Sequence, residues 1–481
     1  MDRGVATSSP PATVPAGGQE GEKEEGGGGG TLPVPVLPDP EVVQGQQVPQ
    51  WMPRIAVIGA GVAGSACAAT LQRAGMAVTI FDQGRGPGGR AGSRTSRLHT
   101  DPDMRIDHGC PHFDCSSTSL FRPEVDQLVS AGVLKKWTGI YRQLDDSTGV
   151  MTDHGVVDPD SNSMTHFADE LFGAADAMGL SCMCSQLLES LPIRNVRYGT
   201  QVTQLKWNGR HWTVIGRTEK VAARDLGTFD WLVCSTFALG HPRFQKLNKL
   251  PPPLCNQQDA RFTSVVKMCS SVESSPVQVV LLAFKDTEAG SVAGTHAFSG
   301  LPFDTLQVRN SEVVERIIYT HSNGYHSFAV HSTNSFGVAH ADVVGSESVR
   351  SCLAGKGPRA AVGSSSAEAS TRDILFAAFL NVLGKTGVVL PKDPDYGPSL
   401  HRWGSAFNTV PSDLCPVSPD LGLAFCGDWT SLTGGVSGSA ESGLEAAAAI
   451  IESTKQPSTA AVCPPLPGSG TDRSVKVPKL S

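Results

Sequence analysis

Several absences narrow the function of this chain. Its 481 residues carry a formal net charge of −7, so it lacks the basic surplus that attracts nucleic acid, and no nucleic-acid binding is expected. No apolar run approaches the ~18 residues that a transmembrane helix needs. The 12 cysteines include no C-x-x-C pair, so we expect no metal site and mostly buried, reduced thiols. These absences favour a soluble protein, expected in the cytoplasm.

Low-complexity sequence lies at both ends. Residues 1–50 combine a glycine run, acidic residues and alternating prolines, and residues 455–481 are rich in proline and serine. Both are predicted to be disordered, because they cannot bury enough apolar surface to offset the entropy of ordering. A similar stretch at 343–371 predicts a loop insertion. The remaining sequence is long enough for two or three domains.

A strand–turn–helix–strand pattern begins the ordered part of the sequence. Its parts are predicted at 55–58, 59–64, 65–75 and 77–81. The turn carries Gly59, Gly61 and Gly64 at the spacing G-x-G-x-x-G. The first glycine permits a tight turn, the second lets a pyrophosphate approach the backbone, and the third lets helix and strand pack closely. Because two strands flank this turn, the pattern favours a dinucleotide site over a structural turn.

The same pattern predicts how a dinucleotide would be held. The helix that follows the turn offers free N–H groups and a positive dipole end to phosphates. Val62 and Ala63, which lie in the turn, belong to the predicted cofactor site. Asp82 lies 18 residues after Gly64, where a carboxylate can accept hydrogen bonds from both ribose hydroxyls. Gln83, which follows it, belongs to the same predicted cofactor site.

Gly88-Gly89-Arg90 comes soon after the second strand. A G-x-G-x-x-G turn, a strand-end acid and this triplet together resemble the flavin-binding start of the amine oxidase superfamily, which includes the phytoene desaturase and renalase branches. In that family the paired glycines approach the cofactor closely and the arginine meets its pyrophosphate. The resemblance therefore implies FAD as the cofactor.

A second motif lies near the end of the sequence. Gly427-Asp428 follows a predicted strand at 422–425 and resembles the late flavin motif of the superfamily, in which the aspartate binds the ribityl chain. An ordinary strand-end turn is the alternative. Gly435 and Val436 open a helix predicted over 437–451, with Ser437 as N-cap. The positive end of this helix would stabilise a reduced flavin.

Val202 resembles the strand residue whose backbone meets the adenine in the family, although plain strand alternation explains it nearly as well. No cysteine lies in the turn TGGVSGS, so the resemblance implies noncovalent FAD.

Further segments resemble renalase and its relatives, and the resemblance spans about residues 54–452. They are RIDHGCPHF at 105–113, LVSAGVLKKW at 128–137 (a helix ending in tryptophan in the family) and the motif His401-Arg402-Trp403. The motif implies that these three residues line the substrate face of the flavin. The alternative is that Arg402 stacks on Trp403 and braces the loop. Pro111-His112 replaces the Gln-Tyr of the family segment, and the chain has only five tyrosines, none near Trp403 in sequence for an amine oxidase's aromatic cage.

These patterns predict an α/β fold. A doubly wound, Rossmann-type FAD-binding domain with a parallel sheet is expected at 53–105, 190–240 and 395–453. An α+β substrate domain on a mixed or antiparallel sheet is expected at 106–189 and 241–394. Apolar spacing in the substrate domain predicts helices at 311–318 and 373–383.

The renalase resemblance implies an oxidoreductase that moves hydride from misreduced dihydronicotinamide dinucleotides to flavin N5, with oxygen or another acceptor reoxidising the flavin. His401 and Arg402 would suit such a phosphorylated small-molecule substrate. An amine oxidase or an isoprenoid desaturase is the first alternative, although a desaturase predicts a long apolar docking segment. A flavin-binding sensor or scaffold without catalysis is an alternative of another class. The sequence does not fix the oligomeric state.

Overall fold

Two large sheets organise the part of the chain that the structure describes. The structure is a computed structural model, and it describes residues 52–94, 104–153, 156–157, 164–165, 170–175, 179–286, 291–292, 295–296, 298, 300–345, 366–391 and 393–455. The predicted disordered segments, residues 1–50 and those after 455, lie outside the described residues. So does most of the predicted insertion at 343–371, although its last residues, from Ser366 on, belong to a helix.

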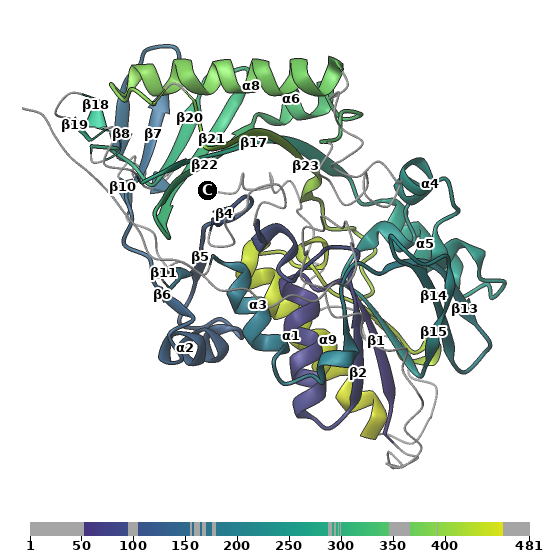
Figure 1. Ribbon diagram of the computed structural model, residues 1–481. Coiled ribbons are helices and arrows are strands. Elements are labelled where there is room, and N and C mark those ends of the chain that lie inside the picture. The colour runs from purple at the N-terminus through teal and green to yellow at the C-terminus, as the bar shows by residue number, and fades with distance from the viewer. Residues whose placement is uncertain are drawn as a thin grey trace, which may run out of the picture. The chain divides into compact units, whose positions relative to one another are not determined.

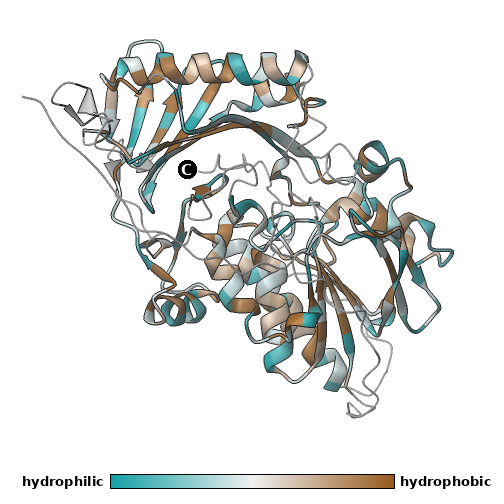
Figure 2. Cartoon of the chain, viewed as in Figure 1, coloured by the Kyte–Doolittle hydropathy of each residue, from teal (hydrophilic) through white to brown (hydrophobic). Residues whose placement is uncertain are grey.

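The first sheet, here called the Rossmann sheet, is parallel except at one edge. Its order is β12 (Val196–Arg197), β2 (Ala77–Phe81), β1 (Arg54–Ile58), β16 (Trp231–Cys234), β25 (Leu423–Phe425) and β24 (Val417–Ser418), and only the β24–β25 pair among them is antiparallel. Figure 2 shows β1 and β2 as largely hydrophobic. Continuous apolar runs are expected here, since parallel strands are covered on both faces.

Helices α1 (Val62–Arg73), α3 (Ser181–Leu188) and α9 (Gly435–Lys455) lie beside this sheet (Figure 1). The pair α1 and α9 comes from the two ends of the described chain. A Cβ added at Gly443 on α9 would lie 2.2 Å from the carbonyl oxygen of Ala63 on α1. Small residues therefore let the two backbones approach, and they place the late part of the sequence next to the first glycine turn.

The second sheet has seven strands. Its order is β23 (Tyr396–Asn408), β17 (Ser274–Lys285), β22 (Tyr325–Ser332), β21 (Val314–Ser322), β20 (Thr305–Arg309), β7 (Tyr141–Asp145) and β8 (Met151–Asp153). The β20–β7 pair is parallel and the other pairs are antiparallel. Helix α8 (Ser366–Lys385) lies along one face (Figure 1), where its Leu375 and Phe379 join a core with Val280 and Phe328 of the sheet.

Smaller elements complete the described fold. Three strands each make up two further sheets, β13 (Gln201–Trp207) with β14 (Trp212–Arg217) and β15 (Arg224–Phe229), and β5 (His112–Cys115) with β11 (Glu170–Ala174) and β6 (Leu134–Lys136). The remaining strands form pairs: β3 (Ser93–Arg94) with β4 (Ile106–Asp107), β9 (Val156–Val157) with β10 (Met164–Thr165), and β18 (Ser291–Val292) with β19 (Thr295–His296). The remaining helices are α2 (Arg122–Ser130), α4 (Arg243–Asn248), α5 (Phe262–Ser270) and α6 (Asn334–Ala339). The α/β fold with a Rossmann-type parallel sheet and a separate, mixed sheet is confirmed.

One predicted helix is wrong. Residues 311–318 contain the first part of strand β21, from Val314 on, rather than a helix. A register shift between Val314 and Arg316 interrupts the strand alternation, so the buried residues fall at 314, 317 and 318. That spacing mimics a helix, because a β-bulge adds one residue to the two-residue period.

Packing also differs from the predicted division of the chain at two places, and a helix expected to end in Trp137 ends earlier. Strand β23, predicted in the FAD-binding domain, pairs along its length with β17 of the seven-stranded sheet. Residues after 241, predicted in the substrate domain, share a core with the Rossmann sheet through Phe244 and Phe262. Helix α2 ends at Ser130, and Trp137 follows strand β6 rather than ending a helix.

Candidate functional site

The first glycine turn combines two crowded positions with one open position. A Cβ added at Gly59, where φ is +109°, would lie 2.1 Å from Ser235 Oγ, and one at Gly64 would lie 1.9 Å from the carbonyl oxygen of Gly59. Among the described residues, a Cβ at Gly61 would meet nothing within 4 Å. The outer glycines are thus required by the fold, whereas Gly61 borders free space.

Helix α1 begins at this free space. Gly61 is its N-cap, with φ −71°, and within the described part of the chain no side chain caps the helix. The first N–H groups of an α-helix have no partner inside the helix, so the start of α1 can offer such groups to a ligand. An anion above Gly61 would also meet the positive end of the helix dipole.

The second glycine loop touches the first one backbone to backbone. Gly88 donates its N–H to the carbonyl oxygen of Ala60 at 2.8 Å. Gly88 and Gly89 have φ values of +105° and +57°, and a Cβ on Gly89 would lie 3.3 Å from the Cα of Gly61. A side chain at either position would strain the loop, so these glycines keep the space above Gly61 open.

Asp82 lies at the carboxyl end of β2, beside both loops. Its carboxylate accepts the N–H of Ala60 at 2.6 Å and that of Gly84 at 2.5 Å. Burial raises the pKa of Asp82, and the two backbone hydrogen bonds oppose that rise. Since a carboxylate offers about four lone-pair sites, it can still accept hydroxyl donors. Val202, by contrast, points its side chain into the core beside Phe81.

Arg90 and Asp428 are bonded to each other. Arg90 Nη1 donates to Asp428 Oδ2 at 2.6 Å, and Nη2 donates to Oδ1. Nη1 also donates to the carbonyl oxygen of Ala406 at 2.9 Å, while Asn408 Nδ2 donates to Asp428 Oδ2 at 3.0 Å. The early and late motifs therefore meet in space, and both are tied to strand β23. The sequence did not indicate this pairing.

The late turn is anchored to α9. Gly427, where φ is +127°, donates its N–H to Ser442 Oγ at 2.8 Å. Helix α9 already begins at Gly435, so the prediction that Ser437 is its N-cap is wrong. The hydroxyl of Ser437 instead donates to the carbonyl oxygen of Asp114 at 2.5 Å, which ties α9 to strand β5.

Two buried polar atoms beside the late turn lack a hydrogen-bond partner among the described residues. They are Asn408 Oδ1 and Trp429 Nε1. Buried polar groups in proteins are normally hydrogen-bonded, so these atoms are typical of a ligand site. The open space at Gly61, the uncapped helix and these two atoms fit a long polar cofactor that carries phosphates.

A row of polar side chains crosses the seven-stranded sheet on the face opposite α8. Arg316 on β21 pairs with His331 on β22. Strand β17 lies between β22 and β23, and its Val279 pairs with His331 on one side and with His401 of β23 on the other. Residues in register on neighbouring strands share a face. Arg316, His331 and His401 therefore lie in one line.

His108, which follows β4, covers this row. Its ring stacks on Trp403 with centroids 4.9 Å apart, and its edge contacts His401 at 4.7 Å. Trp403 Nε1 donates to the carbonyl oxygen of His108 at 2.9 Å, and Arg94 Nη1 lies 3.5 Å from His401 Nδ1. This arrangement, here called the histidine cluster, comprises Arg94, His108, Arg316, His331, His401 and Trp403.

The imidazoles of the histidine cluster are neutral at physiological pH. Burial, followed by the charge of Arg94, lowers the pKa of His108 to about 3. Burial and Arg316 lower the pKa of His331 to about 3, and burial lowers that of His401 well below its ordinary value. Among the described residues His108 Nδ1, His331 Nε2 and His401 Nε2 are buried without a partner. The cluster thus offers unused hydrogen-bonding atoms in a positive field.

Of the three residues in the motif at 401–403, the structure brings only two together. His401 and Trp403 share one face of β23. Arg402, between them, pairs with Gln278 and donates to the carbonyl oxygen of Ala341, just after α6. Alternate residues of a strand point to opposite faces, so Arg402 points away from His401.

Sequence reasoning missed five residues at these sites, namely Arg94, Arg316 and His331 at the histidine cluster, His108 in its role there, and Asn408 beside Asp428. No sequence pattern around His331 indicates that it belongs to the site, because only strand pairing places it near His401.

Comparisons with known proteins agree with this geometry. The family model of an NAD(P)-binding Rossmann-like domain matches residues 57–127, which include both glycine loops. Cyclohexylamine oxidase from Brevibacterium oxydans IH-35A superposes with a TM-score of 0.51 at 14% identity, over 84% of this chain and 100% of that protein. Putrescine oxidase bound to putrescine superposes with a TM-score of 0.50 at 13% identity, over 83% and 99%. The chain has the fold of these amine oxidases.

A curated relative matches only in part. The tRNA 5-methylaminomethyl-2-thiouridine biosynthesis bifunctional protein MnmC of Magnetococcus marinus is 25% identical over 211 residues, which are 38% of this chain and 29% of that protein. The match thus spans less than a third of the relative. In the described part of the chain, no helix has both the length and the apolar character to cross a membrane.

Proposed function

We propose that this protein is an FAD-dependent oxidoreductase that oxidises a small anionic substrate, with reduced nicotinamide dinucleotide isomers as the substrate class. The observation that carries the proposal is the free space above Gly61, bordered by Asp82 and by the loop at Gly88. The fold shared with two oxidases supports it.

Each part of the site has a role in this proposal. The uncapped start of α1 at Val62 and Ala63 binds the pyrophosphate, and Asp82 binds the adenosine ribose. When FAD binds, Arg90 gives up part of its bonding to Asp428 and contacts the pyrophosphate, and Asp428 contacts the ribityl chain. Bound FAD supplies a two-electron acceptor that takes hydride at N5 and is reoxidised by oxygen or another acceptor. The chain itself holds the substrate and excludes water.

The histidine cluster supports an anionic substrate. A guanidinium only donates hydrogen bonds, so the contact with Arg94 leaves the proton of neutral His401 on Nε2. That N–H, together with the charges of Arg94 and Arg316, suits a phosphate or carboxylate oxygen. The same charges repel a protonated amine, which favours a nicotinamide dinucleotide over a polyamine.

Amine oxidation is the second candidate, and the fold likeness to the putrescine and cyclohexylamine oxidases favours it. Trp403 and His108 provide a stacked aromatic surface beside which an alkylamine could lie. An isoprenoid desaturase or a flavin-binding scaffold without catalysis would use the same cofactor site.

Acid precipitation and anaerobic titration separate these proposals. Purified protein should be yellow, and acid should release its FAD to the supernatant, since no covalent bond is expected. The flavin should then bleach rapidly with a mixture of dihydronicotinamide isomers and recover in air. Putrescine, cyclohexylamine and a carotenoid precursor serve as competing reductants. Bleaching by an amine alone would overturn the anionic substrate class, and bleaching by none would favour the scaffold. A colourless protein would overturn the flavin itself.

A further inference from the structure

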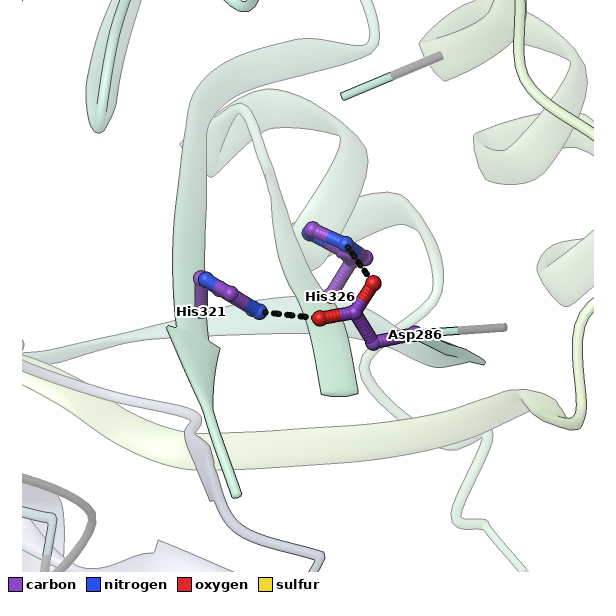
Figure 3. A group of neighbouring side chains, drawn as sticks. All are labelled: Asp286, His321 and His326. Carbon is purple, nitrogen blue, oxygen red and sulfur yellow. Dashed lines mark hydrogen bonds and ion pairs between the residues drawn. The ribbon is translucent and has the colours of Figure 1, made fainter. Parts of the chain in front are cut away.

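A group of three potential metal ligands lies at one end of the seven-stranded sheet (Figure 3). Asp286 follows the last residue of β17, His321 is near the end of β21, and His326 is near the start of β22. His321 and His326 are a directly opposed cross-strand pair. Three strand ends therefore deliver one carboxylate and two imidazoles to one place.

The distances in this group suit a small divalent cation. His321 Nε2 lies 3.2 Å from Asp286 Oδ2, and His326 Nε2 lies 3.7 Å from Asp286 Oδ1. One ligand atom from each residue lies within 4.8 Å of the others. In a tetrahedral zinc site with bonds of about 2.0–2.1 Å, ligand atoms are about 3.3 Å apart. All three atoms reach bonding positions if the side chains rotate so that the two stacked imidazole rings, now 4.3 Å apart, tilt towards a common point.

The environment of His326 prepares it as a ligand. Its Nδ1 lies 2.8 Å from the hydroxyl of Tyr319, so Nε2 faces Asp286. Its ring stacks on Phe298 at 4.0 Å and on His321 at 4.3 Å, and only 12% of its side chain is exposed. A hydrogen bond to the second ring nitrogen orients metal-binding histidines generally.

The group is separate from the proposed substrate site. His326 pairs with Phe284, whose side chain belongs to the core under α8, whereas His331 lies on the opposite face five residues further along β22. At about 3.3 Å per residue, roughly 17 Å of strand separates them. A metal here would not contact a flavin substrate at the histidine cluster.

We propose that Asp286, His321 and His326 bind one Zn²⁺ ion. Two imidazoles and one carboxylate are a donor set that zinc accepts, and the remaining position would be taken by water. The ion would fasten the end of β17 to the β21–β22 hairpin. It would add to the ion pairs from Asp286 to the two histidines and to the hydrogen bond from the Asp286 N–H to the carbonyl oxygen of Gly324.

The test is a calorimetric titration of the full-length, flavin-loaded protein with Zn²⁺ after treatment with a chelator. One equivalent should bind. Asp286→Asn and His321→Gln should each weaken binding by more than about 100-fold, since loss of an outer partner alone costs about 10–100-fold. Both side chains are about half exposed, at 53% and 48%, so melting temperature and flavin content should hold without zinc.

His211 provides a matched control. Its Nδ1 lies 2.9 Å from Asp230 Oδ1, but the described residues offer no third ligand in that pair. His211→Gln should therefore leave the zinc affinity unchanged. Tyr319→Phe, which removes the hydrogen bond to His326, should weaken binding by about tenfold.

Electron paramagnetic resonance of bound Cu²⁺ identifies the ligands. Copper binds the same nitrogen and oxygen ligands as zinc, with higher affinity, and oxidised flavin gives no signal that would overlap. The spectrum should show coupling to two imidazole nitrogens, and His321→Gln should reduce this to coupling to one nitrogen, that of His326. A wild-type protein that binds no zinc would overturn the proposal. So would unchanged zinc binding in the double variant Asp286→Asn, His321→Gln, because the ion would then be held elsewhere.

Discussion

At the scale of single residues, the glycine turn separates requirements of the fold from requirements of a ligand. Gly64 has no room for a methyl group, because a carbonyl oxygen of its own chain occupies that position. Gly61 has ample room and an ordinary φ of −71° that alanine also adopts. Glycine at position 61 is therefore explained by something outside the described chain.

Gly61→Ala tests this reading. The variant should fold normally, and the melting temperature of its flavin-free form should match the wild type, since no described atom lies within 4 Å of the new methyl group. Its FAD affinity should fall at least tenfold, or about 1.4 kcal/mol, because the methyl group would occupy the path of the pyrophosphate. Fluorescence titration of the flavin-free protein measures this affinity.

Gly64→Ala is the contrasting variant. Its methyl group would lie 1.9 Å from a backbone oxygen, so the backbone must shift, and the variant should lose about 1–3 kcal/mol of folding free energy with or without flavin. Equal behaviour of the two variants would show that Gly61 has no special relation to a cofactor.

Asp107 gives the molecule a pH-dependent stability. It is buried, and its carboxylate accepts hydrogen bonds from Ser93 Oγ at 2.5 Å and from the N–H of Leu180 at 3.0 Å. Burial outweighs these bonds and raises its pKa from 3.8 to about 6. The Asp107 carboxyl therefore binds its proton more tightly in the folded state than in the unfolded state. This difference stabilises the folded state, and the stabilisation is complete below pH 3.8. It is lost as the pH rises through 6.

The difference in unfolding free energy between wild type and Asp107→Asn should therefore fall by about 2.4 kcal/mol from pH 4 to pH 7.5. Asparagine keeps the shape and one acceptor of the protonated acid but cannot ionise. Urea denaturation of both proteins across this range measures the difference. A difference that stays constant with pH would mean that Asp107 remains ionised in the folded protein.

At the scale of elements, β23 joins the two sheets functionally. One face of the strand carries His401 and Trp403 toward His108, and the other carries Arg402 toward the loop after α6. Its far end brings Ala406 and Asn408 to Arg90 and Asp428. A single strand thus connects the proposed substrate site with the proposed cofactor site.

The two faces of β23 should respond differently to substitution. His401→Leu should keep its FAD but lower kcat/KM for an anionic substrate at least tenfold, since hydrogen bonds to charged groups contribute about 1.5–3 kcal/mol. Arg402→Lys should instead lower the melting temperature, with any loss of rate independent of substrate charge. Stopped-flow reduction with substrates of opposite charge measures both. A loss of rate confined to anions in Arg402→Lys would place that arginine at the substrate.

At the scale of the whole molecule, the described residues account for both large sheets and both proposed sites. The first 50 residues contribute no motif to them and are poor in the apolar periodicity that builds cores. Deletion of residues 1–48 should therefore leave the FAD content unchanged and the melting temperature within about 2 °C of the full chain. Absorbance at the flavin band and a thermal melt measure this. A large fall in either would show that the segment binds to the folded part.

Local patterns in the sequence were enough to predict the local parts of the protein. The glycine turn, its flanking strands and Asp82 were predictable because each rests on backbone geometry or periodicity within about thirty residues. The late Gly427-Asp428 turn was predicted from its resemblance to a family motif. The same local logic failed at β21, where a bulge between Val314 and Arg316 gives a strand the spacing of a helix.

Which distant residues meet depends on the tertiary structure. Strand pairing aligns His331 with His401 across Val279, and it places Arg402 on the other face. It also brings Arg90 to Asp428, and Asp286 to His321 and His326. Such contacts depend on sheet order and on the register of strands far apart in the chain. No local pattern encodes either one, because a shift of one residue would turn every side chain to the opposite face.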